Sequence, residues 1–380
     1  MKNFIDIYNG INEQEILQKI NNVERRHVIN ALSKETLSID DFIALISPES
    51  DEFMDEMAMR SRHTTEKHFG KIMNLYVPLY LSNECTSGCA YCGFNKDKSI
   101  PRKTLNEDEI EIQLIELNKM GFKNVLLLTG DSRKYAGVDY ISRTIKKARK
   151  LFPHVGLEVY PMDILEYSLL VNSGANMLTV YQETYNREKY KLVHLAGKKT
   201  DFIYRVETPE RALQAGFRRI GLGVLLGLHN PVTESVYMAL HAGFLMKKYW
   251  RSEVSISFPR LRKSEAGYIP DYDVTDFQLV KIILALRLFL PTVGIAISTR
   301  ESSDFRDNMI DLGVTMMSAG SKTNPGGYTD NCSGKQFEIE DDRNVGDVLR
   351  AIKKRGYSPV FKDWDENFLS TKGGIFGINH

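Results

Sequence analysis

Three cysteines with distinctive spacing, Cys85, Cys89 and Cys92, lie within eight residues of a chain that has only four cysteines. Structural zinc sites are closed by four ligands, and no second cysteine pair or nearby histidine completes such a set. The fourth cysteine, Cys332, lies far downstream, and we expect it to be a free thiol. Iron–sulfur clusters also use thiolate ligands, and a catalytic metal keeps one position open. The spacing Cys-x3-Cys-x2-Cys therefore favours a cluster with one metal position left for a substrate.

Eight short apolar segments that favour strands alternate with segments of helical composition. The strand-like segments are 75–82, 124–129, 155–160, 177–181, 219–226, 253–258, 293–298 and 313–318. Such alternation predicts an α/β protein with a parallel sheet, and a count of eight predicts a (β/α)8 TIM-type barrel. An open doubly wound sheet is the alternative, but no nucleotide-binding fingerprint follows the first strand.

Two extensions flank the predicted barrel. Residues 1–70 have helical apolar spacing and no strand-like run, which predicts a helical N-terminal extension. The barrel would occupy residues 71–320, and residues 321–380 would form a short C-terminal extension packing on it, with a helix at 347–356. Active sites of such barrels lie at the C-terminal ends of the strands. The three cysteines fall in the loop after the first strand, on this predicted catalytic face.

The composition limits the classes of partner. The chain has 380 residues, a net charge of +1 and 42% hydrophobic residues. A near-neutral balance gives no electrostatic basis for binding nucleic acid or an anionic membrane. We find no secretory signal and no apolar run approaching the roughly 18 residues of a membrane span. Because the cysteines do not form a disulfide framework, we expect a cytoplasmic protein.

The cysteine segment, with Tyr91 before the last cysteine and Gly-Phe after it, resembles the radical S-adenosylmethionine enzymes. The resemblance implies a [4Fe–4S] cluster held by Cys85, Cys89 and Cys92. It also implies that S-adenosylmethionine chelates the open iron and is cleaved to a 5′-deoxyadenosyl radical. A structural zinc site or unrelated thiols are the alternatives for these cysteines.

The same resemblance implies which further residues bind the cofactor. The implied residues are Tyr91, Gly130, Asp131, Glu158, Gln182, Glu183 and Arg205. Gly130 and Asp131 match a segment that accepts from the cofactor ammonium, although a helix N-cap is the alternative for Asp131. Either Gln182 or Glu183 would bond the ribose hydroxyls. Arg205 would pair with the cofactor carboxylate through two parallel hydrogen bonds.

Glu158 lies within the third strand among apolar residues. A carboxylate is costly to bury there unless it is paired, so a cofactor or substrate role and a structural ion pair are both open. Four other charged residues near strand ends or in loops, Lys198, Lys199, Arg260 and Arg262, are expected to be solvated, and we assign them no role.

Strings along nearly the whole chain resemble the aromatic amino acid lyases of the radical family, above all the tyrosine lyases of thiazole biosynthesis. Among them are 180–185, 195–202, 257–262, 324–328 and 361–365. The resemblance implies cleavage of the Cα–Cβ bond of L-tyrosine to 2-iminoacetate and p-cresol. A tryptophan lyase is the alternative within this class, and a non-catalytic zinc-binding protein is the alternative outside it. A longer lyase of hydrogenase maturation has three further C-terminal cysteines, whereas only one cysteine follows Cys92 here.

Three residues are expected to bind the substrate, two of them at strand ends and Tyr80 by the resemblance alone. Arg300, after the seventh strand, would bind the carboxylate of the amino acid, and an ion pair with Glu301 or Asp304 is the alternative. Ser318 would share that work and Tyr80 would lie near the amine; core hydroxyls are the alternatives for both. The resemblance also implies a flavodoxin- or ferredoxin-type electron donor and association with thiazole synthase.

Overall fold

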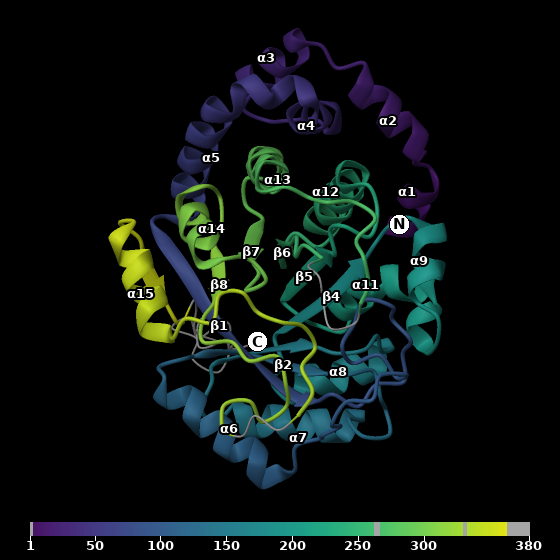
Figure 1. Ribbon diagram of the computed structural model, residues 1–380, viewed down its shortest axis with the longest axis vertical. Helices are drawn as coiled ribbons and strands as arrows, with labels where there is room; N and C mark the ends of the chain where they lie inside the picture. Colours follow the sequence, from purple (N-terminus) through teal and green to yellow (C-terminus); the bar gives the residue numbers. More distant parts are fainter. Residues whose placement is uncertain (1–2, 262–266, 330–332, 363–380) are drawn as a thin grey trace, which may run out of the picture.

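Eight parallel strands form a closed barrel in the computed structural model, which describes residues 3–261, 267–329 and 333–362 (Figure 1). They are β1 (Ile72–Ser82), β2 (Asn124–Thr129), β3 (His154–Glu158), β4 (Met177–Glu183), β5 (Arg219–Val224), β6 (Glu253–Ser257), β7 (Gly294–Ile297) and β8 (Met316–Ser318). Each strand pairs with the next, and β1 closes the ring by pairing with both β8 and β2. The predicted barrel is confirmed. Arg262, Cys332 and residues 363–365 lie outside the described residues.

Helices lie between the strands and cover the barrel. They are α6 (Glu107–Lys119), α7 (Val138–Ala148), α8 (Ile164–Asn172), α9 (Arg187–Val193), α10 (Phe202–Val206), α11 (Thr208–Gln214), α12 (Pro231–Lys248), α13 (Asp276–Phe289) and α14 (Ser303–Asn308). None of the helices in the described part of the chain has the length and hydropathy that a membrane crossing needs.

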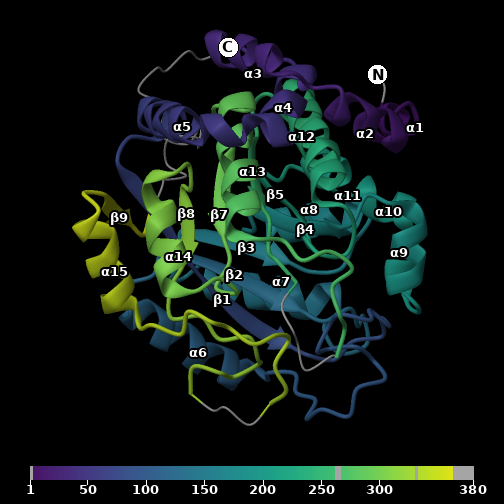
Figure 2. The same ribbon diagram turned by 45° about the horizontal axis from the view of Figure 1, so that its top comes forward.

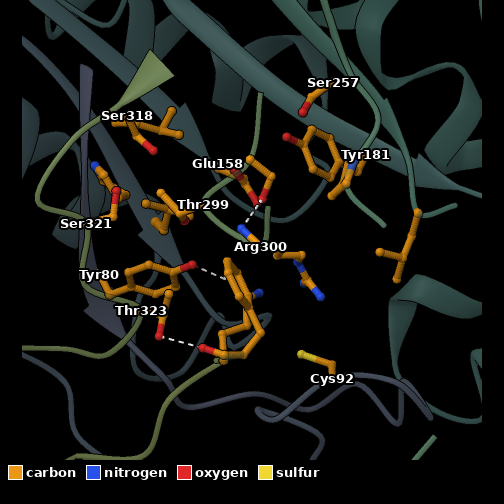
Figure 3. A pocket seen from close by; sticks show the side chains of 18 of the residues that line it. Tyr80, Cys92, Glu158, Tyr181, Ser257, Thr299, Arg300, Ser318, Ser321 and Thr323 are labelled. Carbon is orange, nitrogen blue, oxygen red and sulfur yellow. Dashed lines mark hydrogen bonds between the residues drawn. The ribbon is translucent and has the colours of Figure 1, made fainter. Parts of the chain in front are cut away.

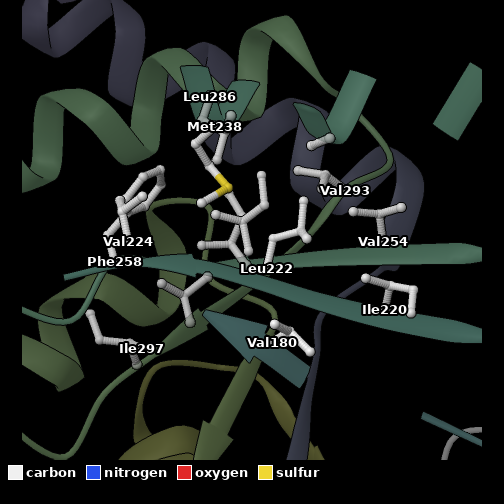
Figure 4. Packing of buried hydrophobic residues seen from close by; sticks show 14 of the residues in the cluster. Val180, Ile220, Leu222, Val224, Met238, Val254, Phe258, Leu286, Val293 and Ile297 are labelled. Atoms are coloured by element: carbon white, nitrogen blue, oxygen red, sulfur yellow. The ribbon is translucent and has the colours of Figure 1, made fainter. Parts of the chain in front are cut away.

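Alternation along β5 separates the core from the barrel interior. Ile220, Leu222 and Val224 belong to the buried apolar cluster that packs against α12 and α13 (Figure 4). The residues between them are glycines, because the interior side of β5 is filled by its neighbour β4. A Cβ at Gly223 would collide with the ring of Tyr181. The glycine-rich strand is therefore shaped by side chains of the barrel, which is consistent with the absence of a dinucleotide fingerprint.

The N-terminal extension is helical, as predicted, and lies over the side of the barrel formed by α12 and α13 (Figure 1). Its helices are α1 (Phe4–Asn9), α2 (Glu13–Asn21), α3 (Arg25–Ser33), α4 (Ile39–Ile46) and α5 (Met54–Phe69). The ring of Phe4 stacks on that of His241 in α12, with centroids 3.8 Å apart. The hydroxyl of Tyr8 donates to the backbone oxygen of Tyr185 at 2.6 Å.

The C-terminal part adds a strand that the sequence did not predict. Helix α15 (Val345–Lys354), close to the predicted helix, leads into β9 (Ser358–Val360) beside the barrel (Figure 2). Strand β9 pairs in parallel with residues 72–74 of β1. The pairing of β1 with β2 begins only at Val77, so β9 occupies the edge of β1 that β2 leaves free.

Candidate active site

Polar side chains gather where the barrel strands end. Glu158 is the last residue of β3, Glu183 of β4, Ser257 of β6 and Ser318 of β8, and Tyr80 lies near the end of β1. Parallel strands deliver their C-terminal ends to one mouth of the barrel. The predicted strand-end residues are therefore brought to one place.

The loop that contains the three cysteines is held on two sides. Residues after α9 form a short antiparallel pairing with it, in which the backbone amide of Leu195 donates to the oxygen of Gly88 at 3.0 Å. On the other side, Ser87 Oγ donates to Asp131 Oδ2 at 2.7 Å. Asp131 is not the helix cap considered as its alternative, because α7 begins at Val138 with Gly137 as its N-cap. Its carboxylate instead holds the cysteine loop.

Gly130 allows the loop after β2 to approach the cysteine loop. A Cβ at this position would collide with the backbone oxygen of Glu84 and lie 3.2 Å from Cβ of Cys85. The backbone amide of Gly130 donates to the oxygen of Ser82 at 2.8 Å. The glycine is therefore required by packing next to the first cysteine.

A cavity that we call the cysteine pocket is lined by Cys85, Cys89 and Cys92 together with Gly130, Asp131, Glu158, Glu183, Lys199 and Arg205. Burial raises the pKa of the Cys89 thiol to about 12. Among the described residues, no three Cys, His, Asp or Glu side chains form a ready-made site for one metal ion. Three thiols that face one cavity beside two buried cations are nevertheless a donor set that suits an iron–sulfur cluster.

A network of ion pairs lines part of the cysteine pocket. Lys199 Nζ donates to Glu183 Oε1 at 2.7 Å, and a guanidinium nitrogen of Arg205 lies 4.0 Å from the same oxygen. Burial alone would raise the pKa of Glu183, but Lys199 and Arg205 outweigh it and hold that pKa below its ordinary value. Arg205 also donates through Nε to the oxygen of Tyr181 at 2.7 Å. The expectation that Lys199 is solvated was wrong, because this lysine is the main partner of Glu183.

Glu183 has a strained backbone. Its φ is +71°, the only positive value of a non-glycine residue among the described residues. L-residues rarely adopt this conformation, and where they do, function is a common reason.

Gln182, the alternative to Glu183, lines neither this cavity nor the neighbouring one, and its buried Nε2 has no hydrogen-bond partner among the described residues.

Tyr91 is fixed by a buried histidine. Nδ1 of His194 lies 2.9 Å from the backbone oxygen of Tyr190 and must donate to it. Nε2 of the neutral ring therefore accepts from the hydroxyl of Tyr91 at 2.8 Å. Burial keeps the imidazole uncharged by lowering the pKa of His194 well below its ordinary value.

A second cavity, the arginine pocket, lies beside the first (Figure 3). It is lined by Arg300, Tyr80, Ser318, Ser257, Tyr181, Tyr91, Thr299, Gln336 and Phe337, among others. Both cavities also share Cys92, Glu158 and Glu183 as lining residues. The cysteines and Arg300 therefore face two parts of one continuous site.

Arg300 is a partly buried cation whose guanidinium has no hydrogen-bonded or ionic partner among the described residues. Its Cζ lies 3.8 Å from the ring centre of Phe337, and burial lowers the pKa of the guanidinium. No carboxylate, hydroxyl or carbonyl within the described ranges pairs with this guanidinium. A charge taken out of water needs a counter-ion, so this pocket suits an anionic group of a ligand.

Of the two alternative partners of Arg300, Glu301 is engaged elsewhere, and among the described residues Asp304 forms no ion pair with Arg300. Arg260 Nε donates to the two carboxylate oxygens of Glu301 at 3.0 and 3.1 Å, and Arg260 also pairs with Asp276 at 2.7 Å. The expectation that Arg260 is solvated was wrong, since its side chain is buried in this ion pair. This pairing leaves Arg300 free to meet a ligand.

Glu158 lies at the border of the two cavities. Burial, reinforced by the nearby charge of Glu183, raises the pKa of Glu158 to about 7. No ion pair in the described chain neutralises it, so the structural ion pair considered as its alternative is not formed. Glu158 can therefore hold a proton beside both pockets at neutral pH.

Comparisons with known proteins agree with this geometry. Residues 79–240 match the Radical SAM superfamily, and residues 257–358 match the Biotin and Thiamin Synthesis associated domain. The chain is 41% identical to 2-iminoacetate synthase of Escherichia coli (strain K12) over 367 residues, which cover 96% of this chain and 97% of that one. The chain belongs to the 2-iminoacetate synthase family.

Solved relatives of this family share the fold. The FeFe-hydrogenase maturase HydG from Carboxydothermus hydrogenoformans superposes with a TM-score of 0.87 at 30% identity, covering 95% of this chain and 86% of that one. Methylornithine synthase (PylB) superposes with a TM-score of 0.71 at 21% identity, covering 88% of this chain and 97% of that one, and shows the fold alone.

Membership of the 2-iminoacetate synthase family makes this protein a radical S-adenosylmethionine lyase, and the non-catalytic zinc-binding alternative was wrong. The superfamily implies a [4Fe–4S] cluster and S-adenosylmethionine. The cysteine pocket fits both groups by its chemistry, since it offers thiols for iron, a carboxylate at Glu183 and a guanidinium at Arg205.

Sequence reasoning missed two residues that the C-terminal part contributes to the site. Gln336 Oε1 accepts from the hydroxyl of Tyr80 at 2.6 Å, and the ring of Phe337 covers Arg300. Neither residue follows a barrel strand, so no strand-end rule could have found them. They lie within the match to the Biotin and Thiamin Synthesis associated domain.

Proposed function

We propose that this protein cleaves L-tyrosine between Cα and Cβ to 2-iminoacetate and p-cresol, for the thiazole of thiamine. The observation that carries the proposal is the position of Arg300, a partly buried cation with no ionic partner in the described part of the chain, in a cavity that shares lining residues with the cysteine pocket. An amino acid held there by its carboxylate lies next to the group that generates the radical. The 41% identity to 2-iminoacetate synthase supports this choice of reaction.

The cysteine pocket provides the binding groups for the cofactors. Cys85, Cys89 and Cys92 would hold three irons of the cluster. Arg205 would pair with the carboxylate of S-adenosylmethionine, and Glu183 would accept from its ribose hydroxyls. When bound, these groups supply a 5′-deoxyadenosyl radical. Lys199 keeps Glu183 ionised and therefore able to accept.

The arginine pocket orients the substrate. Arg300 would bind the carboxylate of tyrosine through two parallel hydrogen bonds, with Ser318 beside it. Tyr80 would lie near the amino group, from which the hydrogen is taken. Because a reactive radical must meet one particular hydrogen, positioning contributes more here than acid–base strength.

The stoichiometry requires external electrons. One electron would be consumed in generating the radical, and a second electron with a proton would convert the p-hydroxybenzyl fragment to p-cresol. Glu158 is the titratable group at the border of the two pockets that can hold this proton. A low-potential flavodoxin- or ferredoxin-type donor would supply the electrons. Thiazole synthase is the expected consumer of the short-lived imine.

The test is product analysis with the reconstituted protein. We expect tyrosine, S-adenosylmethionine and a low-potential reductant, kept anaerobic, to give p-cresol and 5′-deoxyadenosine in matching amounts. Cys89→Ala serves as the control and should lose bound iron and form neither product. Deoxyadenosine without p-cresol would show that tyrosine is not the substrate, and an indole product formed from tryptophan would assign the alternative lyase activity.

A further inference from the structure

A segment of the C-terminal part, residues 333–341, crosses the mouth of the barrel, and we call it the strap. At one end, the backbone amide of Gly93, next to Cys92, donates to the oxygen of Gln336 at 3.0 Å. A Cβ at Gly93 would lie 2.6 Å from the same oxygen, so the cysteine loop and the strap are in direct contact. At the other end, the amide of Glu340 donates to the oxygen of Thr299 at 2.9 Å. The strap therefore joins the cysteine loop to the residue before Arg300.

Phe337 lies in the middle of the strap and is held on both sides. The amide of Gln336 donates to the oxygen of Thr323 at 2.9 Å, and Thr323 Oγ1 donates to the oxygen of Phe337 at 2.8 Å (Figure 3). These bonds fix the backbone from which the ring projects. The backbone position from which the ring projects toward Arg300 is thus set by contacts within the chain.

The ring of Phe337 covers one face of the guanidinium of Arg300, at 3.8 Å from Cζ. The N–H groups of a guanidinium point outward in its plane, so a stacked arginine still offers them to a carboxylate. The backbone of Arg300 is fixed as well, because its amide donates to Ser298 Oγ at 3.1 Å. Since no other described side chain pairs with this guanidinium, Phe337 is the contact that sets its plane.

We infer that Phe337 is a positioning residue for the amino acid substrate, which fixes the plane in which Arg300 meets the carboxylate. The inference rests on the proposed function and adds a residue to it. Through Gln336, the same strap also binds the hydroxyl of Tyr80. The strap therefore positions both Arg300, for the carboxylate of the substrate, and Tyr80, for its amino group, relative to the cysteine loop.

The test compares Phe337→Leu, which removes the aromatic face, with Phe337→Tyr, which keeps it. A desolvated cation–π contact supports an expected loss of about tenfold in affinity, equivalent to about 1.4 kcal/mol. Binding of labelled tyrosine is measured by equilibrium dialysis with cluster and S-adenosylmethionine but without reductant. Turnover should show a KM raised about tenfold with kcat changed less than about twofold.

The matched control is Phe305→Leu. Its ring lies under Arg260 at 5.1 Å, but Arg260 is already bound by Glu301 and Asp276. Tyrosine affinity should therefore stay unchanged in this variant and in Phe337→Tyr. If Phe337→Leu lowers the melting temperature, Phe337→Met repeats the test with a flexible side chain of similar size.

Each result has a defined meaning. Wild-type affinity in a folded Phe337→Leu or Phe337→Met variant overturns the inference and leaves the proposed function standing. Equal weakening in Phe305→Leu overturns it too, because the effect would then not be specific to Arg300. Wild-type protein that binds no tyrosine contradicts the proposed function itself.

Discussion

Replacing Arg300 by methionine should abolish tight tyrosine binding without lowering the stability of the unliganded protein. This combination is unusual, because most buried arginines stabilise the fold through a partner. Arg300 has no hydrogen-bonded or ionic partner in the described chain and contacts only the uncharged ring of Phe337, and burial lowers the pKa of its guanidinium, so the folded protein holds this charge at a cost.

The expected losses of affinity and of stability differ, because Arg300 has an ionic partner only when the substrate is bound. Truncating one partner of a buried charged pair costs about 2–5 kcal/mol in binding, which corresponds to roughly a 30- to 5,000-fold weaker affinity for tyrosine. In the unliganded protein, removing the unpaired charge should leave the free energy of unfolding equal or raise it. Arg260→Met is the matched control, because it removes one partner of the buried Arg260–Glu301 ion pair, a change that costs about 3–5 kcal/mol of stability.

The assay joins urea unfolding of the cluster-free proteins with dialysis of labelled tyrosine against the reconstituted proteins. Arg300→Met should unfold at the wild-type urea concentration or above it and bind tyrosine poorly, whereas Arg260→Met should unfold earlier. If Arg300→Met is as unstable as Arg260→Met, Arg300 has a structural partner. If it keeps wild-type affinity for tyrosine, the carboxylate is bound elsewhere.

Two further predictions concern the cysteine loop and the border of the pockets. Gly130→Ala should lower the amount of iron bound per chain, because the added Cβ collides with the backbone oxygen of Glu84. Gly243→Ala is the control and should bind iron as the wild type does, because the nearest atom to its added Cβ is 3.7 Å away. Equal iron in the two variants would contradict this account of the loop. Glu158→Gln should raise the free energy of unfolding in a pH-dependent way. The carboxyl pKa is about 7 in the folded protein against an ordinary 4.5, so wild-type stability falls as pH rises from 4.5 to 7. The variant should thus gain up to about 3 kcal/mol at pH 8 and nothing at pH 4, and urea unfolding with the same difference at both pH values would refute it.

The sequence predicted those parts of the site that local pattern determines. Each barrel strand is an apolar run of its own, so the residue at its end can be located without knowing the fold in detail. Ser318 was placed at a strand end in this way, whereas Glu158 was placed within the third strand, which in the structure ends at that residue, and Glu183 was named by the resemblance as one of two alternatives. The cysteine spacing is equally local, because all three ligands lie in one loop.

The parts that the sequence did not predict depend on contacts between distant segments. Lys199 stands in a pair of lysines that resembles any solvated surface, and only its contact with Glu183 distinguishes it from Lys198. Phe337 and Gln336 belong to a segment without regular periodicity. Strand β9 is three residues long, which is too short for alternation to be recognised. Arg260 is buried because it pairs with the carboxylates of Glu301 and Asp276, which lie far from it in the sequence.

The contact between Gly93 and Gln336 also fixes an order of events during synthesis. The cysteine loop leaves the ribosome long before the strap does, and at roughly 5–20 residues per second the delay is on the order of 10 to 50 seconds. For most of that interval the nascent chain has its thiols but neither Arg300 nor the strap. A cluster inserted early would reside in a protein that cannot yet retain an amino acid. Docking of the strap would then complete the pocket that holds the substrate beside the cluster.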